Sequence, residues 1–104
     1  VSGMELQDTY ATVCGNTIDV TNIDGYHYGY YVFGISYCQS TSGNHTYNIT
    51  NNTVRVPHGD YAVYLDGVVN SNVSCNHLKA RYTTGNYAIH MTGSNNSYGN
   101  NTSA

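Results

Sequence analysis

The chain has 104 residues, which is room for one domain, and charged residues make up only 9% of it. Its three Lys and Arg residues cannot form the basic patch that a phosphate backbone needs, so nucleic acid is excluded as the main partner. Tyr (12) and Gly (11) are abundant, Trp is absent, and the usual helix formers are scarce. This composition predicts an all-β protein, and no apolar run is long enough to span a membrane.

A repeat runs through the chain in the order of its predicted strands. Each copy opens with two apolar residues two positions apart, at Met4/Leu6, Phe33/Ile35, Val63/Leu65 and Ile89/Met91. A second pattern follows: an apolar residue, two spacers, an Asn and two apolar residues that alternate with polar ones. It covers 13–20, 49–56 and 73–80, with a partial copy over 98–101. Alternation over so few residues indicates short β-strands, and the Gly and Asn clusters between them indicate turns.

Three short strands in each repeat predict one coil of a parallel β-solenoid. We expect a right-handed parallel β-helix of about 3.5 coils in a single domain spanning 1–104. The expected coils cover 3–30, 31–60, 61–86 and 87–104. Neither end offers a segment that would cap an apolar interior. We therefore expect either a segment of a longer solenoid or a chain that stacks end to end on its own copies.

The apolar positions of these strands are expected to form one core. Its predicted members are Met4, Leu6, Val13, Ile18, Val20, Phe33, Ile35, Ile49, Val54, Val56, Val63, Leu65, Val73, Leu78, Ile89 and Met91.

One Asn recurs at the same position of every coil, and this column consists of Asn16, Asn52, Asn76 and Asn101. Asn tolerates the left-handed backbone of a sharp bend, and its amide both donates and accepts hydrogen bonds. Stacked Asn residues would form a ladder that satisfies buried polar groups. We therefore expect loss of Asn52 or Asn76 to destabilise the fold more than loss of Asn70 or Asn86.

Three segments resemble the right-handed parallel β-helix repeats of the pectate-lyase-like superfamily: 61–67 (YAVYLDG), 70–78 (NSNVSCNHL) and 85–96 (GNYAIHMTGSNN). The richness in Asn, Tyr and Gly is similar to that of archaeal adhesin-like surface proteins and of periplasmic NosD-type proteins. The similarity covers 45–101 well and 3–35 more loosely. Because the superfamily includes polysaccharide lyases, glycosidases, phage tailspikes and surface stalks, the resemblance implies the fold and leaves the activity open.

An immunoglobulin-like β-sandwich is the alternative fold, because the separation of Cys14 and Cys75 is compatible with its inter-sheet disulfide. The chain lacks the Trp of such domains, and a sandwich does not account for the repeat. In a β-helix the two residues lie two coils apart, about 10 Å, which exceeds the roughly 7 Å limit for a disulfide. We expect Cys14, Cys38 and Cys75 to be free thiols, buried or half-buried.

The outer face of the first sheet is the candidate binding surface. Its outward column is expected to contain Gly34, Tyr64 and His90, with Ser36, Asp66 and Thr92 beside it. Aromatic faces beside carboxylate and hydroxyl groups fit sugar rings, which have apolar C–H faces and polar rims. The carbohydrate-binding candidates are Tyr64, Asp66 and His90, together with Tyr28 and Tyr30 of the loop that leads into this sheet. The alternative is that Tyr serves here only as a solvated strand former.

Catalytic chemistry has less support in the pattern. A lyase needs clustered Asp residues for calcium with a Lys or Arg base, whereas the Asp residues here are dispersed. Asp19, Arg55 and Lys79 share one outward column, either as a charged catalytic row or as plain surface charge. No two His have ligand spacing, so no metal or cofactor is expected. A polysaccharide lyase or glycosidase is the alternative function, and two acids with a base within reach on the first sheet would favour it.

Asn-x-Ser/Thr sequons make glycosylation candidates of Asn44, Asn48, Asn51, Asn72, Asn95 and Asn100, whereas Asn101 is expected to be too buried. The sequons, the low Lys content and the repeats favour an extracellular or cell-surface location. We expect a structural, adhesin-like β-helix that presents a Tyr-rich face to a glycan or a surface protein.

Overall fold

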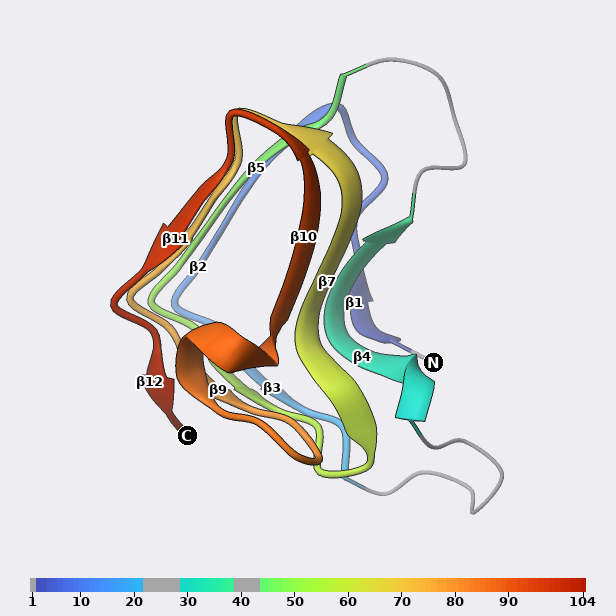
Figure 1. Cartoon of the computed structure of the whole chain (residues 1–104), viewed down its shortest axis with the longest axis vertical. Coiled ribbons are helices and arrows are strands. Elements are labelled where there is room, and N and C mark those ends of the chain that lie inside the picture. The colour runs from blue at the N-terminus through green and yellow to red at the C-terminus, as the bar shows by residue number, and fades with distance from the viewer. Residues whose placement is uncertain (1, 22–28, 39–43) are drawn as a thin grey trace.

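A computed structural model describes residues 2–21, 29–38 and 44–104, which form four coils of a β-helix (Figure 1). Coil 1 consists of β1 (Ser2–Glu5), β2 (Tyr10–Cys14) and β3 (Thr17–Asp19). Coil 2 consists of β4 (Gly29–Cys38), β5 (Thr46–Thr50) and β6 (Thr53–Arg55). Coil 3 consists of β7 (Gly59–Val69), β8 (Asn72–Ser74) and β9 (His77–Lys79). Coil 4 begins with the short 3₁₀ helix η1 (Gly85–Ala88) and continues with β10 (Ile89–Ser94), β11 (Ser97–Gly99) and β12 (Thr102–Ser103).

Equivalent strands of successive coils pair and form three sheets. The first sheet has the order β1-β4-β7-β10, the second β2-β5-β8-β11 and the third β3-β6-β9-β12. Every pairing between the described strands is parallel, which confirms the parallel β-helix and excludes the antiparallel sandwich. In Figure 1 the chain rises through β10 and descends through β11 as it comes toward the viewer, so the β-helix is right-handed. None of the described helices is long and apolar enough to cross a membrane.

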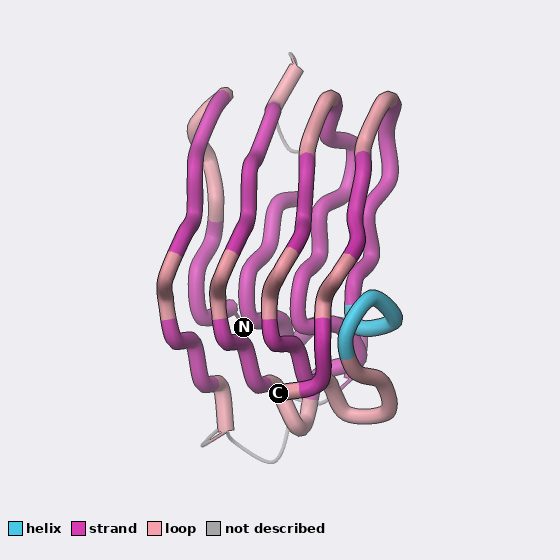
Figure 2. The backbone as a smooth tube through the Cα atoms, turned by 90° about the vertical axis from the view of Figure 1, so that its left-hand side faces the viewer, coloured by secondary structure: helices cyan, strands magenta, loops and turns pink. Residues whose placement is uncertain are grey.

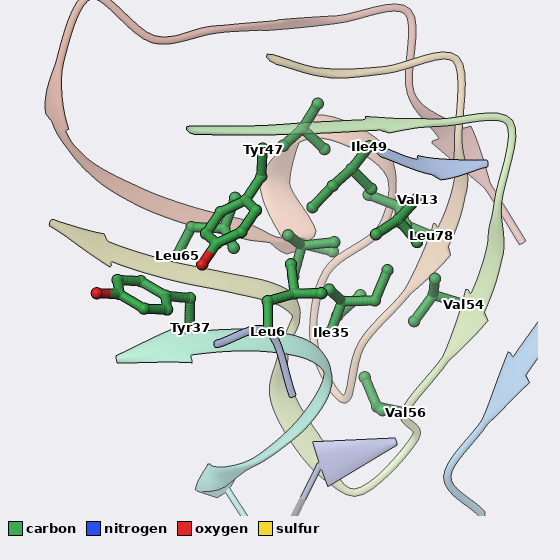
Figure 3. Packing of buried hydrophobic residues seen from close by; sticks show 14 of the residues in the cluster. Leu6, Val13, Ile35, Tyr37, Tyr47, Ile49, Val54, Val56, Leu65 and Leu78 are labelled. Atoms are coloured by element: carbon green, nitrogen blue, oxygen red, sulfur yellow. The ribbon is translucent and has the colours of Figure 1, made fainter. Parts of the chain in front are cut away.

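The interior of the coils is a single apolar core (Figure 3). Side chains such as Ile35, Ile49 and Leu65 are fully buried in it, because each has a coil on both sides. Leu6 and Val13 of coil 1 are buried as expected. Five other expected core members of the two outer coils are only partly buried: Met4, Ile18, Val20, Ile89 and Met91. The prediction that all the expected core positions would be buried was therefore wrong for these five, because the described residues place a coil on only one side of them.

The first strand of coil 2 lies in a register that differs from the predicted one. Phe33 pairs with Tyr61 and Ile35 with Val63, whereas the repeat alignment had placed Phe33 beside Val63. Gly34 is buried, and a Cβ atom on it would lie 2.1 Å from the Cγ1 atom of Val54. Two successive residues, Gly34 and Ile35, thus face the core, and this break in the strict alternation explains the error.

A left-handed residue sets the sharp corner between the second and third sheets. The residues with positive φ are Gly15, Asn51, Cys75 and Asn100, at 73°, 57°, 58° and 55°. Each directly precedes a member of the expected Asn column, so the bend itself does not fall on that column. The left-handed backbone expected of the column belongs to its neighbour, and the column residues have a different task.

Candidate functional site

The expected Asn column forms a continuous hydrogen-bonded ladder. The backbone N–H and the Nδ2 atom of Asn52 both donate to Oδ1 of Asn76, at 2.9 and 3.0 Å. Asn76 donates in the same way to Asn101, at 3.0 and 2.9 Å, and Asn16 to Asn52, at 2.9 and 3.1 Å. Asn52 and Asn76 have no solvent exposure. Since a buried amide without partners is costly, this ladder fixes the corner of every coil.

The last rung of the ladder is Asn86, which the repeat does not predict as a member of it. Its Oδ1 atom accepts hydrogen bonds from the Nδ2 atom of Asn101 at 2.8 Å and from the backbone N–H at 3.3 Å. Asn86 lies in η1, which projects beyond the last coil (Figure 2). The expectation that loss of Asn86 would have little effect was therefore based on a wrong placement, because no repeat position marks this residue.

Aromatic rings stack along the outer face of the first sheet, from coil 2 to coil 4. The ring of Tyr64 lies between those of Phe33 and His90, with centroid distances of 4.5 and 4.4 Å. Tyr61 lies beside them, 5.8 Å from Tyr64 and 5.3 Å from His90. We call Phe33, Tyr61, Tyr64 and His90 the aromatic stack. Ser36, not Gly34, precedes Tyr64 in the outward column, as the corrected register requires.

A polar rim lies at the coil 4 end of the aromatic stack. The Thr92 hydroxyl donates to Oδ1 of Asp66 at 2.7 Å and accepts from the backbone N–H of Gly67 at 2.9 Å. The same carboxylate oxygen lies 3.9 Å from Nε2 of His90. The Asp66 and His90 side chains are 48% and 28% exposed. Because two hydrogen bonds orient Thr92, its bond to Asp66 holds that carboxylate in place at the rim.

The predicted binding residues have different environments. Asp66 and His90 come together at the polar rim, but Tyr64 is only 4% exposed, so its ring cannot serve as an open platform. Tyr28 lies outside the described residues, and of Tyr30 only the backbone, in β4, is described. Tyr61 was missed. It lies three residues before Tyr64 on the same face, a spacing that strict alternation does not produce.

An enzyme was expected to have two acids with a base within reach on the first sheet, and the described part of the face does not have this arrangement. It joins one acid, Asp66, to one base, His90, at a distance longer than a hydrogen bond. No group of three or more His, Cys, Asp or Glu side chains that could hold a metal ion occurs among the described residues. On the third sheet Asp19 pairs in register with Arg55, and Arg55 with Lys79, so these residues do form one column.

The sequons divide into two groups by environment. Asn44, Asn51, Asn95 and Asn100 are exposed. Asn48 and Asn72 are half-buried and joined to each other, since Nδ2 of Asn72 donates to Oδ1 of Asn48 at 3.2 Å. A glycan on Asn72 would break this bond.

The thiols of Cys14 and Cys75 are free and exposed, which corrects the prediction that they would be buried or half-buried. Cys75 is exposed because it occupies the left-handed corner position, where the side chain points away from the core. The side chain of Cys38 lies outside the described residues.

A buried polar cluster at the start of β5 had not been predicted. The Tyr47 hydroxyl donates to the backbone carbonyl of Asp8 at 2.6 Å, and Nδ1 of His45 lies 3.0 Å from the same carbonyl. The ring of Tyr37 stacks on His45 at 4.5 Å. Burial, with smaller contributions from Tyr37 and Asp8, raises the pKa of Tyr47 to about 12. This cluster ties coil 2 to coil 1.

Comparisons with protein-family models, with curated proteins and with solved structures found no match to this chain.

Proposed function

We propose that this chain is a structural, adhesin-like β-helix of an extracellular or cell-surface protein, and that the polar rim of its aromatic stack binds a glycan. The resemblance of its repeats to the pectate-lyase-like superfamily, and within it to adhesin-like and NosD-type surface proteins, supports this role. The observation that carries the binding proposal is that a partly exposed ring, His90, lies beside an oriented carboxylate, Asp66.

The chemistry of the rim favours a neutral sugar. The C–H face of a sugar ring packs on an aromatic ring, here His90 with the tilted ring of Tyr61 beside it. The Asp66 carboxylate accepts hydrogen bonds from sugar hydroxyls, and hydrogen bonds to a charged acceptor are the stronger ones. A uronic acid or a sulfated sugar would place a second negative charge beside Asp66, and the chain already carries a formal charge of −3. We therefore expect a neutral, hydroxyl-rich oligosaccharide.

Calorimetric titration of the intact chain with neutral and uronic-acid oligosaccharides tests this function. We expect binding of a neutral oligosaccharide, and Asp66→Asn and His90→Ala should each weaken it at least about tenfold, or about 1.4 kcal/mol. Asp19→Asn, which removes an exposed carboxylate from the third sheet, is the matched control and should have no effect. Absence of binding to every oligosaccharide, or an equal loss in the control, would contradict the glycan site.

The same titration mixtures distinguish a binding protein from the alternative polysaccharide-active enzyme. Release of new reducing ends or of unsaturated sugars, abolished by Asp66→Asn, would establish a glycosidase or a lyase. Unchanged oligosaccharides after long incubation, together with measurable affinity, are the result that a binding role requires.

A further inference from the structure

We infer that the N-terminal end of this β-helix is a docking surface for another parallel β-helix coil that carries a ladder Asn, and that Asn86 closes the C-terminal end to such a coil. The inference rests on the hydrogen bonds of the ladder and is independent of the proposed glycan site.

The interface in question already occurs inside the chain. Each inner ladder Asn accepts two hydrogen bonds on its Oδ1 atom from the Asn of the preceding coil. Its Nδ2 atom reaches back to a carbonyl of that coil: Asn52 to Val13 at 2.9 Å and Asn76 to Ile49 at 3.0 Å. The next backbone N–H does the same, as His77 donates to the carbonyl of Asn52 at 2.8 Å. A preceding coil therefore supplies two donors and two acceptors at this corner.

Among the described residues, Asn16 and Thr17 make none of these four bonds to a preceding coil. No described residue donates to the Oδ1 atom of Asn16, its Nδ2 atom donates only to Cys14 of its own coil and to Asn52, and Thr17 N–H has no described acceptor. Asn16 is accordingly half-buried, whereas Asn52 and Asn76 are fully buried. The apolar side chains of Ile18 and Val20 beside it are also only partly buried. The N-terminal face of coil 1 thus has the same chemistry as the interface that already joins each pair of successive coils in the chain.

The C-terminal end differs because the chain closes its own ladder there. Asn86 accepts the two hydrogen bonds that Asn101 would otherwise donate to a following coil. Asn101 is only 8% exposed although it lies in the last coil. Gly85 allows η1 to approach Asn101 closely. Its φ is 60°, and a Cβ atom on it would lie 2.8 Å from the Asn101 carbonyl oxygen. Figure 2 shows η1 on the outer side of the last coil.

This asymmetry identifies the partner. A second copy of the same chain cannot dock through its own C-terminal end, because its donors on Asn101 are already bonded to Asn86. The expected end-to-end stacking of identical copies therefore has no ladder to continue. The occupant that fits is a β-helix coil whose ladder Asn still has a free backbone N–H and a free amide.

An opened version of the chain supplies that partner as a defined probe. In this probe, residues 80–87, which include Asn86, are replaced by a copy of residues 56–61. In the natural chain, residues 56–61 lead from β6 into β7 one coil earlier and contain no helix. Asn16→Ala in the same probe blocks its N-terminal end, so that it can bind only in one direction. We expect a one-to-one complex with the ¹⁵N-labelled natural chain in analytical ultracentrifugation, with shifted amide signals at Cys14, Asn16 and Thr17. A labelled chain carrying Asn16→Ala should bind at least about tenfold more weakly.

A covalent version tests the same surface in case the opened probe does not fold. A coil built from residues 63–79 followed by 56–60 is placed directly before Ser2, which keeps the strand register. The added coil should raise the unfolding midpoint, and Asn16→Ala should then destabilise the chain as much as Asn52→Ala does. The control has Ala in place of the ladder Asn of the added coil. A folded probe that stays monomeric with the natural chain, or an added coil that leaves the midpoint unchanged, overturns the inference.

Discussion

Oδ1 of Asn76 accepts two hydrogen bonds from Asn52, one from the backbone N–H and one from the side-chain amide. A single acceptor atom thus joins the corners of two coils, inside a part of the molecule that water does not reach.

Asn76→Ala is expected to lower the free energy of unfolding by about 3 kcal/mol, because it leaves buried donors on Asn52 without an acceptor. Urea denaturation followed by circular dichroism measures the change. Asn70→Gly is the control, since Asn70 is exposed and Gly keeps its left-handed backbone at a φ of 52°. Its effect should stay within about 0.5 kcal/mol. Equal losses for both variants would show that the ladder has no special role in stability.

Asn86→Ala should cost about 1–3 kcal/mol, because it leaves the two donors of Asn101 without their acceptor. Asn86→Asp should retain most of the stability, since a carboxylate oxygen accepts the same two bonds. The comparison separates the acceptor role from side-chain size, and denaturant titration of the two variants measures it. A loss in Asn86→Asp as large as in Asn86→Ala would count against capping of the ladder.

Gly34→Ala tests the corrected register of β4. The new Cβ atom would lie 2.1 Å from Val54 Cγ1 and 2.7 Å from the Ala62 carbonyl oxygen. Overpacking of this kind costs typically about 1–3 kcal/mol. Gly99→Ala is the control, because nothing lies within 4 Å of its added Cβ atom. If thermal denaturation showed equal stability for the two variants, Gly34 would face solvent, as the repeat alignment predicts.

In a spectrophotometric pH titration, Tyr47 should ionise at a higher pH than the ordinary pKa of a tyrosine side chain. Its pKa is about 12 in the folded chain, against the ordinary value of 10.0. The folded state therefore binds the proton more tightly than the unfolded state does, so the contribution to stability is complete below pH 10 and is lost as the pH rises toward 12. Tyr47→Phe should remove the late absorbance step. Tyr98→Phe, at an exposed position, is the control and should leave the late step unchanged.

The sequence by itself determined the repeat and its corner. A period of two in the apolar residues is a direct consequence of burying one face of a strand, so the strands around Ile49, Val63 and Val73 could be predicted. The ladder positions followed because one residue type recurs at one place in each copy, and a stacked amide can bond to its equivalent in the next coil. These are properties of each coil and its immediate neighbour, and they do not depend on the ends of the molecule.

The tertiary structure alone decided the register of β4, the burial of Tyr64 and the closure by Asn86. Gly34 and Ile35 both face the core, and the repeat alignment could not anticipate two inward residues in succession. Counted back from the Ile89–Val63 pair, Asn86 occupies the position of Asp60, which lies in strand β7. In coil 4 the same position lies in η1 instead, and Asn86 accepts there the two hydrogen bonds that Asn101 donates. Which partner an amide finds at an end depends on the neighbours that remain, and a local pattern does not contain that information.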